Sequence, residues 1–224
     1  MIILAVDLTS EFGSLAIRRD GRNVIERSVE SRTGFAHLLF PALESILSEA
    51  DIKLAEITCF AVSTGPGAFT GLRVAIAGVK GLAEVMSKPA LGVSKMRAMA
   101  SFGTANARIV LLDARRGEAF AAVYNEALEP VVEETVTKAR DWLALLPENH
   151  PYQLITADAE WLGPIVATTA FETAERIETP RLLAGAVALC AEDDLRRGGV
   201  AGDPLVLDAN YVRRSDAELY WTDN

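Results

Sequence analysis

The apolar positions near the start of the chain change their spacing several times, and each spacing predicts a different element. A continuous apolar run at 2–7 predicts a short buried strand. Strands are also predicted at 12–18 and 23–29, separated by Asp20-Gly21, a dipeptide typical of a hairpin turn. These three segments predict an antiparallel meander at the beginning of the fold.

Helical spacing follows the meander. Between residues 34 and 50, apolar side chains recur three and four positions apart, which predicts an amphipathic helix. Pro41 lies inside this pattern, where it either kinks the helix or marks a new first turn. The next predicted elements are strands at 57–62 and 89–93 and helices at 71–86 and 94–102. The order β-β-β-α-β-α-β-α predicts two parallel crossovers after the meander.

The opening pattern occurs twice along the chain. Ile2–Asp7 is echoed by Arg108–Asp113, and each aspartate is followed by a polar turn with a glycine and then by an alternating strand. The repeat predicts an α/β protein of two related lobes, 1–103 and 104–224. The second lobe is reduced, because its later segments are less regular, and its C-terminal tail can pack back on the first. Those later segments are 139–146, 152–157, 180–197 and the tail 205–213.

The charge of the chain restricts its partners. Among its 224 residues, 22 are Lys or Arg and 31 are Asp or Glu, which gives a net charge of −9. Affinity for nucleic acids comes largely from basic clusters, so the chain is not expected to hold RNA or DNA by itself. No apolar run is long enough for a membrane span, and no basic segment precedes the first strand. We expect a cytoplasmic protein with no membrane contact.

Cysteine and histidine offer little catalytic chemistry. Cys59 and Cys190 each stand alone in an apolar stretch, which is typical of buried reduced thiols. The two histidines, His37 and His150, belong to no metal-ligand spacing. We therefore predict neither a metal site nor a cofactor.

A glycine-rich turn lies between a predicted strand and a predicted helix. Thr64–Gly71 has the spacing G-x-G-x-x-x-G, which matches neither a dinucleotide-binding nor a P-loop pattern, and Pro66 lacks the N–H that a phosphate would use. Phosphate binding at the helix N-terminus is one interpretation. The other is a tight turn that allows close helix packing, since small residues form two stripes on the helix. The stripes are Gly71, Ala75 and Gly78, and Ala77 and Gly81.

Asp7 is a second candidate for phosphate chemistry. It ends the first strand and is followed by Thr9, and Asp113 is its counterpart in the repeat. A carboxylate at this point can hold a magnesium-bound phosphate through water, or it can cap the hairpin turn. The candidate vestigial phosphate contacts are Asp7, Thr9, Gly65, Gly67 and Asp113.

The helix at 34–50 has a wider apolar face than one core contact needs. Phe40 and Pro41 extend this face beyond the stripe that a single core requires. A surface for a partner protein explains the excess, and burial within the same lobe is the alternative.

Several motifs together resemble those of a known family. The segment Ser63–Arg73, STGPGAFTGLR, is similar to the G-P-G-S-F-T-G-[VL]-R signature of the TsaB (YeaZ) family, which serves in making N6-threonylcarbamoyladenosine in tRNA. Leu4–Ser10 resembles the A-I-D-T-S start of the family, and Asp113–Glu118 and Tyr211–Arg213 match further stretches. The resemblance covers most of the chain and is strongest over 1–125.

The resemblance implies the actin, sugar-kinase and Hsp70 (ASKHA) fold and a non-catalytic relative of the transferase TsaD. The H-H-M-E-G-H motif of TsaD corresponds to Ser94–Met99, with Lys95 and Met99 at the positions of the metal-binding histidines. An ammonium group and a thioether are poor ligands for hard metals. Thr9 also replaces the glycine of the phosphate-contacting Asp-x-Gly pattern. The family thus implies a pseudoenzyme without catalytic residues.

The resemblance also implies partners. TsaB pairs with TsaD through its first two helices and activates it, the ATPase TsaE joins that dimer, and a homodimer forms through the same surface when TsaB is alone; tRNA is reached only indirectly. The implied interface positions are Phe35, His37, Leu38, Leu39, Pro41, Leu43, Ile46, Gly71, Val74, Ala75, Gly78 and Leu82. The alternative is an independent enzyme, either a nucleotide-binding protein of the kinase type or a metallopeptidase.

Overall fold

The computed structural model describes residues 1–31, 34–148, 150–198 and 202–212. They divide into two compact units: one contains Met1–Ser101 and Pro180–Ala209, and the other contains Phe102–Thr179 and the described residues from Asn210 on. The segment Pro180–Ala209, which the sequence analysis placed within 104–224, is thus grouped with the N-terminal residues.

The first unit contains a five-stranded sheet in the order β3-β2-β1-β4-β5. Its strands are β1 (Ile2–Asp7), β2 (Phe12–Arg19), β3 (Arg22–Glu30), β4 (Cys59–Ser63) and β5 (Ala90–Val93). The first three strands are antiparallel, and β4 and β5 run parallel to β1. This arrangement is the predicted meander followed by two parallel crossovers.

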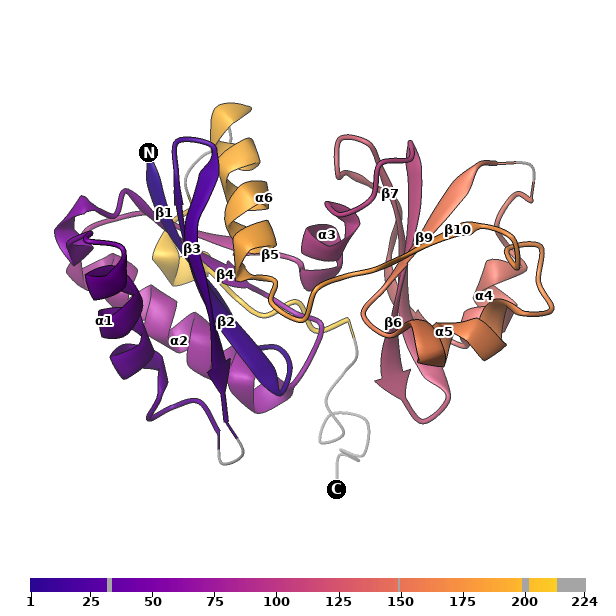
Figure 1. Ribbon diagram of the computed structural model, residues 1–224, viewed down its shortest axis with the longest axis horizontal. Helices are drawn as coiled ribbons and strands as arrows, with labels where there is room; N and C mark the ends of the chain where they lie inside the picture. Colours follow the sequence, from indigo (N-terminus) through magenta and orange to yellow (C-terminus); the bar gives the residue numbers. More distant parts are fainter. Residues whose placement is uncertain (32–33, 149, 199–201, 213–224) are drawn as a thin grey trace, which may run out of the picture. The chain divides into compact units, whose positions relative to one another are not determined.

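Helices cover both faces of this sheet (Figure 1). They are α1 (Leu39–Glu49), α2 (Phe69–Val85), α3 (Lys95–Ala100) and α6 (Ala184–Arg196), with the short 3-10 helices η1 (Leu54–Glu56) and η2 (Pro204–Val206). Leu4 and Val6 of β1 share one apolar core with α1 and α2. Side chains alternate along a strand, so Asp7 points to the opposite face, on which α6 packs.

The first helix begins later than its apolar spacing predicts. Residues 35–38 form turns, and α1 starts at Leu39. Pro41 therefore lies in the first turn, where its missing N–H has no intrahelical partner to lose. Of the two interpretations of Pro41, the new first turn is confirmed.

The second unit repeats the topology of the first. Its sheet has the order β10-β9-β6-β7-β8, with β6 antiparallel to β7 and parallel to β9, as β1 is to β2 and β4. The elements are β6 (Ala107–Arg115), β7 (Glu118–Asn125), β8 (Pro130–Thr137), α4 (Ala139–Leu143), β9 (Tyr152–Thr156), α5 (Ala159–Val166) and β10 (Glu175–Glu178). Three of these elements, β8, α5 and β10, were not predicted from the sequence. Both missed strands are sheet edges with no fully buried side chain, and neither has a continuous apolar run.

Candidate functional site

The carboxyl ends of the parallel strands bring polar residues to one edge of the first sheet. Val6 of β1 pairs with Val62 of β4, which places Asp7 beside Ser63, and Ser63 pairs with Val93 of β5. Two residues after Val93, α3 begins with Lys95. Ser63 was not among the residues predicted for the site, although its position directly after a predicted strand parallel to the first could have indicated it.

Thr9 and the glycine-rich turn enclose Asp7, which is only 1% exposed. The backbone N–H and the hydroxyl of Thr9 donate to Oδ1 of Asp7 at 3.0 and 2.6 Å. The carbonyl of Thr9 in turn accepts from the N–H of Ala68 at 2.7 Å, and a Cβ on Gly67 would overlap that carbonyl. The turn is therefore packed on Thr9, and Thr9 holds the buried carboxylate of Asp7.

The other two predicted phosphate contacts have different surroundings. The carbonyl of Gly65 accepts from the backbone N–H of Lys95 at 2.6 Å, so this glycine joins the turn to α3. Asp113 belongs to the second unit, where its carboxylate accepts from the backbone N–H of Arg115 at 2.7 Å. The contacts described for Asp113 are those of a turn residue.

Side chains from the meander cap the N-terminus of α6. The hydroxyl of Ser14 accepts from the N–H groups of Leu183 and Ala184 at 3.2 and 3.0 Å, and Glu26 accepts from Gly185 at 2.8 Å. These bonds satisfy N–H groups that the first turn of a helix leaves free. This contact was not predicted, because its partners are far apart in the chain.

Glu26 gives a pH-dependent prediction. Burial is the largest influence and raises its pKa from 4.5; the charge of Asp7 adds to this, and the N–H groups of Gly185 and Ala184 oppose it. The folded chain thus binds this proton more tightly than the unfolded chain, and stability falls as the pH rises from 4.5 through the raised pKa. We expect Glu26→Gln, which keeps an oxygen for Gly185, to be more stable than wild type at pH 7.5.

Because Glu26 is partly exposed, solvent screening limits the expected gain to less than about 1 kcal/mol. Urea unfolding at pH 7.5 and pH 4 measures it. The gain should disappear at pH 4, where the wild-type carboxyl group is itself protonated; equal stability of the two proteins at pH 7.5 would contradict the prediction.

The structure divides the implied interface positions into two groups. Six are buried in the first unit, five of them as side chains of its own apolar core: Phe35, Leu39, Leu43, Ile46, Gly71 and Ala75. A buried side chain cannot also be offered to a partner, so these six cannot form a direct contact surface in this conformation. His37 and Pro41 are exposed, and Leu38, Val74, Gly78 and Leu82 are half-buried.

The two small-residue stripes of α2 face different surroundings. A Cβ on Gly71 would overlap the carbonyl oxygen of Leu8, and one on Gly78 would lie 2.5 Å from Cδ2 of Leu39. This stripe therefore lets α2 approach β1 and α1 within the same unit. Ala77 and Gly81 are exposed, and a Cβ on Gly81 would meet no atom within 4 Å.

Large apolar side chains are also exposed on these two helices. Phe40 of α1 is 51% exposed, and Phe69 and Val85 of α2 are 40% and 82% exposed. The guanidinium of Arg73 lies over the Phe69 ring, 3.7 Å from its centroid. We use the name helical face for the set of these exposed residues of α1 and α2: Phe40, Pro41, Phe69, Ala77, Gly81 and Val85.

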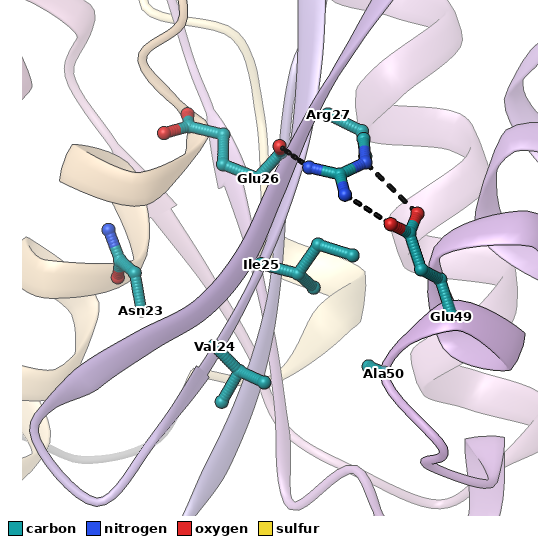
Figure 2. Close-up of a pocket in the computed structure, with 7 residues that line it drawn as sticks. All are labelled: Asn23, Val24, Ile25, Glu26, Arg27, Glu49 and Ala50. Carbon is teal, nitrogen blue, oxygen red and sulfur yellow. Dashed lines mark hydrogen bonds and ion pairs between the residues drawn. The ribbon is translucent and has the colours of Figure 1, made fainter.

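A surface hollow of about 500 Å³ lies between β3 and the C-terminal end of α1. Figure 2 shows the Arg27–Glu49 ion pair across it, with Val24 and Ile25 on the strand and the Glu26 side chain pointing away. The hollow is lined by none of the predicted site residues. Its one ion pair is exposed and is more typical of a solvated surface than of a catalytic site.

Comparison with known proteins identifies the family. The family model described as TsaD, tRNA N6-adenosine threonylcarbamoyltransferase, matches residues 30–174. A tRNA threonylcarbamoyladenosine biosynthesis protein TsaB from Escherichia coli is 30% identical, over 72% of this chain and 70% of its own length. The chain belongs to the TsaB family. The TsaB of Bacillus subtilis is 25% identical, over 100% of this chain and 99% of its own length.

A solved structure of the same family supports the fold. YeaZ from Pseudomonas aeruginosa superposes with a TM-score of 0.76 at 25% identity, covering 94% of this chain and 99% of that one. The two five-stranded mixed sheets with the same strand pairing are those of the ASKHA fold, as predicted.

Other features of this TsaB-family chain bear on its chemistry. The described residues include no group of three or more His, Cys, Asp or Glu side chains placed to hold a metal ion. No described helix is both long and apolar enough to span a bilayer.

Cys59 and Cys190 are free and buried, as predicted, and burial raises the pKa of each thiol to about 12. Both thiols are therefore protonated and weakly nucleophilic at neutral pH.

Proposed function

We propose that this chain is a non-catalytic subunit that dimerises with a TsaD threonylcarbamoyltransferase and activates it in forming N6-threonylcarbamoyladenosine in tRNA. The observation that carries the proposal is the helical face, in a chain of the TsaB family. Exposing its aromatic and aliphatic side chains to water is unfavourable, and burying them against a partner would lower the free energy.

The helical face has the composition of a docking surface. Phe40 and Phe69 are large side chains of the kind that anchor protein interfaces. Ala77 and Gly81 present little more than backbone, so a partner helix can approach α2 closely. The same surface would serve a homodimer when TsaD is absent, and the ATPase TsaE would join the heterodimer.

The surroundings of Asp7 support a role without catalysis. Thr9 holds one oxygen of its carboxylate, and the glycine-rich turn is packed on Thr9. A nucleotide phosphate at this point would have to displace contacts that belong to the chain's own core. The net charge of −9 fits a subunit that leaves tRNA binding to its partner.

Reconstitution tests the proposed function. The full chain is expected to co-purify with the cognate TsaD, to form no modified tRNA when TsaD is omitted, and to raise the rate of modification when it is added back. The measurement is the amount of N6-threonylcarbamoyladenosine per tRNA in each mixture. A TsaD that is equally active with and without the chain would contradict the proposal.

Calorimetry with ATP and magnesium addresses the alternative of an independent enzyme. We expect no binding by the isolated chain at micromolar concentrations. Binding that Asp7→Ala abolishes would favour a kinase-like protein instead, because it would require an open phosphate site at the end of β1.

A further inference from the structure

Arginines gather at one end of the first unit, where the β2–β3 turn lies beside the C-terminal end of α6 (Figure 1). Arg19 and Arg22 flank the turn Asp20-Gly21 and lie directly opposite each other in the hairpin. Arg196 of α6 lies over this turn, since its Nη2 atom is 3.4 Å from the point that a Cβ on Gly21 would occupy. We use the name basic end for the exposed residues Arg19, Arg22 and Arg196.

The two hairpin arginines have no carboxylate partner. Among the described residues, none forms an ion pair with the guanidinium group of Arg19 or Arg22. Asp20, which lies between them in the turn, accepts from the N-terminal ammonium group of Met1 at 2.7 Å instead. Like charges directly opposite each other on paired strands are destabilising. The hairpin therefore keeps a like-charge pair that its own fold does not require.

Arg196 adds a further positive charge. It shares the buried carboxylate of Glu192 with Arg18, at N–O distances of 3.0 and 2.6 Å. One carboxylate cannot balance two guanidinium groups, and the Arg196 side chain is still 60% exposed. The charges of Arg19 and Arg196 are among the smaller causes that lower the pKa of Asp20, after its bond to the N-terminal ammonium group. The basic end thus presents an excess of positive charge to solvent.

This positive end contrasts with the rest of the chain. Residues 102–179 contain more than twice as many acidic residues as basic ones, whereas residues 1–101 contain nearly equal numbers. Most of the net charge of −9 is therefore carried outside the first 101 residues. A polyanion that the chain repels as a whole can still meet a favourable potential at the basic end.

We propose that the basic end contacts the phosphodiester backbone of tRNA while the TsaD partner holds that RNA. This inference rests on the proposed function. RNA is the polyanion named for the TsaB relatives, and a planar guanidinium group can donate two parallel hydrogen bonds to one phosphate. Three such groups cannot hold RNA alone against the net charge of the chain, so the contact adds to the affinity that TsaD supplies.

Charge reversal at the hairpin tests the contact. Arg19→Glu combined with Arg22→Glu should raise the KM for tRNA at least about tenfold in the reconstituted complex, with kcat at saturating tRNA unchanged. The slope of log KM against log KCl concentration should fall by about 1 for each arginine removed. The dissociation constant for TsaD should stay at the wild-type value, because the helical face is intact.

A single change separates RNA contact from folding. Arg22→Glu places a carboxylate opposite Arg19, so the melting temperature of the free chain should rise while the KM for tRNA increases at least about threefold. Arg22→Lys keeps the charge and should retain most of the affinity. Arg176→Glu makes the same change in net charge at an exposed arginine of β10 in the second unit and should leave KM unchanged.

The possible results separate this inference from the proposed function. An active complex whose KM for tRNA is unchanged in the double variant would overturn the RNA contact alone. Weaker binding of TsaD by the double variant, with an unchanged KM for tRNA, would make the basic end a protein contact and would also overturn it. A TsaD that is equally active with and without the wild-type chain would overturn both proposals.

Discussion

Replacing Gly81 by arginine is expected to weaken the association with TsaD at least about a hundredfold while leaving the chain folded. A side chain at Gly81 meets no atom of the chain within 4 Å, so it fits the free protein. It would, however, place a long charged group where a partner helix must approach α2. The measurement is the dissociation constant for the cognate TsaD, with the melting temperature of each free variant.

Two controls separate docking from folding. Gly81→Ala adds one methyl group and should retain binding. Gly163→Arg makes the same change on α5 of the second unit, at a glycine that also has no neighbour within 4 Å, and should bind as wild type does. Unchanged affinity in Gly81→Arg would exclude this part of the helical face from the interface.

Gly71→Ala should destabilise the chain by about 3 kcal/mol, even though alanine is the better helix former. Its Cβ would overlap the backbone carbonyl of Leu8 and would lie 3.3 Å from the Phe35 ring, so backbone must move to admit it. The free energy of unfolding in urea measures the loss.

Gly81→Ala is the matched control on the same helix. Since Gly81 is exposed and has open space, alanine there should stabilise the chain by about 0.5–1 kcal/mol through helix propensity alone. Opposite signs for the two glycines would show that one stripe of α2 is packed within the chain and that the other is not. A loss of less than about 1 kcal/mol in Gly71→Ala would contradict the packing described here.

Charged substitutions inside the core could not distinguish a loss of docking from a loss of folding. Leu39→Glu would bury a carboxylate among the side chains of the first unit, and Gly78→Arg would meet Cδ2 of Leu39. Both would destabilise the chain itself, so lost binding in either variant would say nothing about the partner surface.

The order of elements in the N-terminal residues follows from local patterns. Strands β1 and β4 are buried on both faces and therefore read as apolar runs, while α1 and α2 repeat at helical spacing. The repeat around Asp7 and Asp113 likewise predicts two sheets with the same pairing. Edge strands such as β8 give no such pattern, because none of the β8 side chains is fully buried and the strand has no continuous apolar run.

The sequence by itself determined the family, the two-lobed α/β topology and the presence of two small-residue stripes on α2. Only the tertiary structure decided which stripe is buried. Gly71 and Gly78 pack against Leu8 and Leu39, which lie far from them in the sequence, and the helical spacing of α2 does not specify such neighbours. It likewise brought Ser63 and Lys95 to the edge that Asp7 occupies. Contacts of this kind arise when strands pair, and no local pattern in a single chain specifies them.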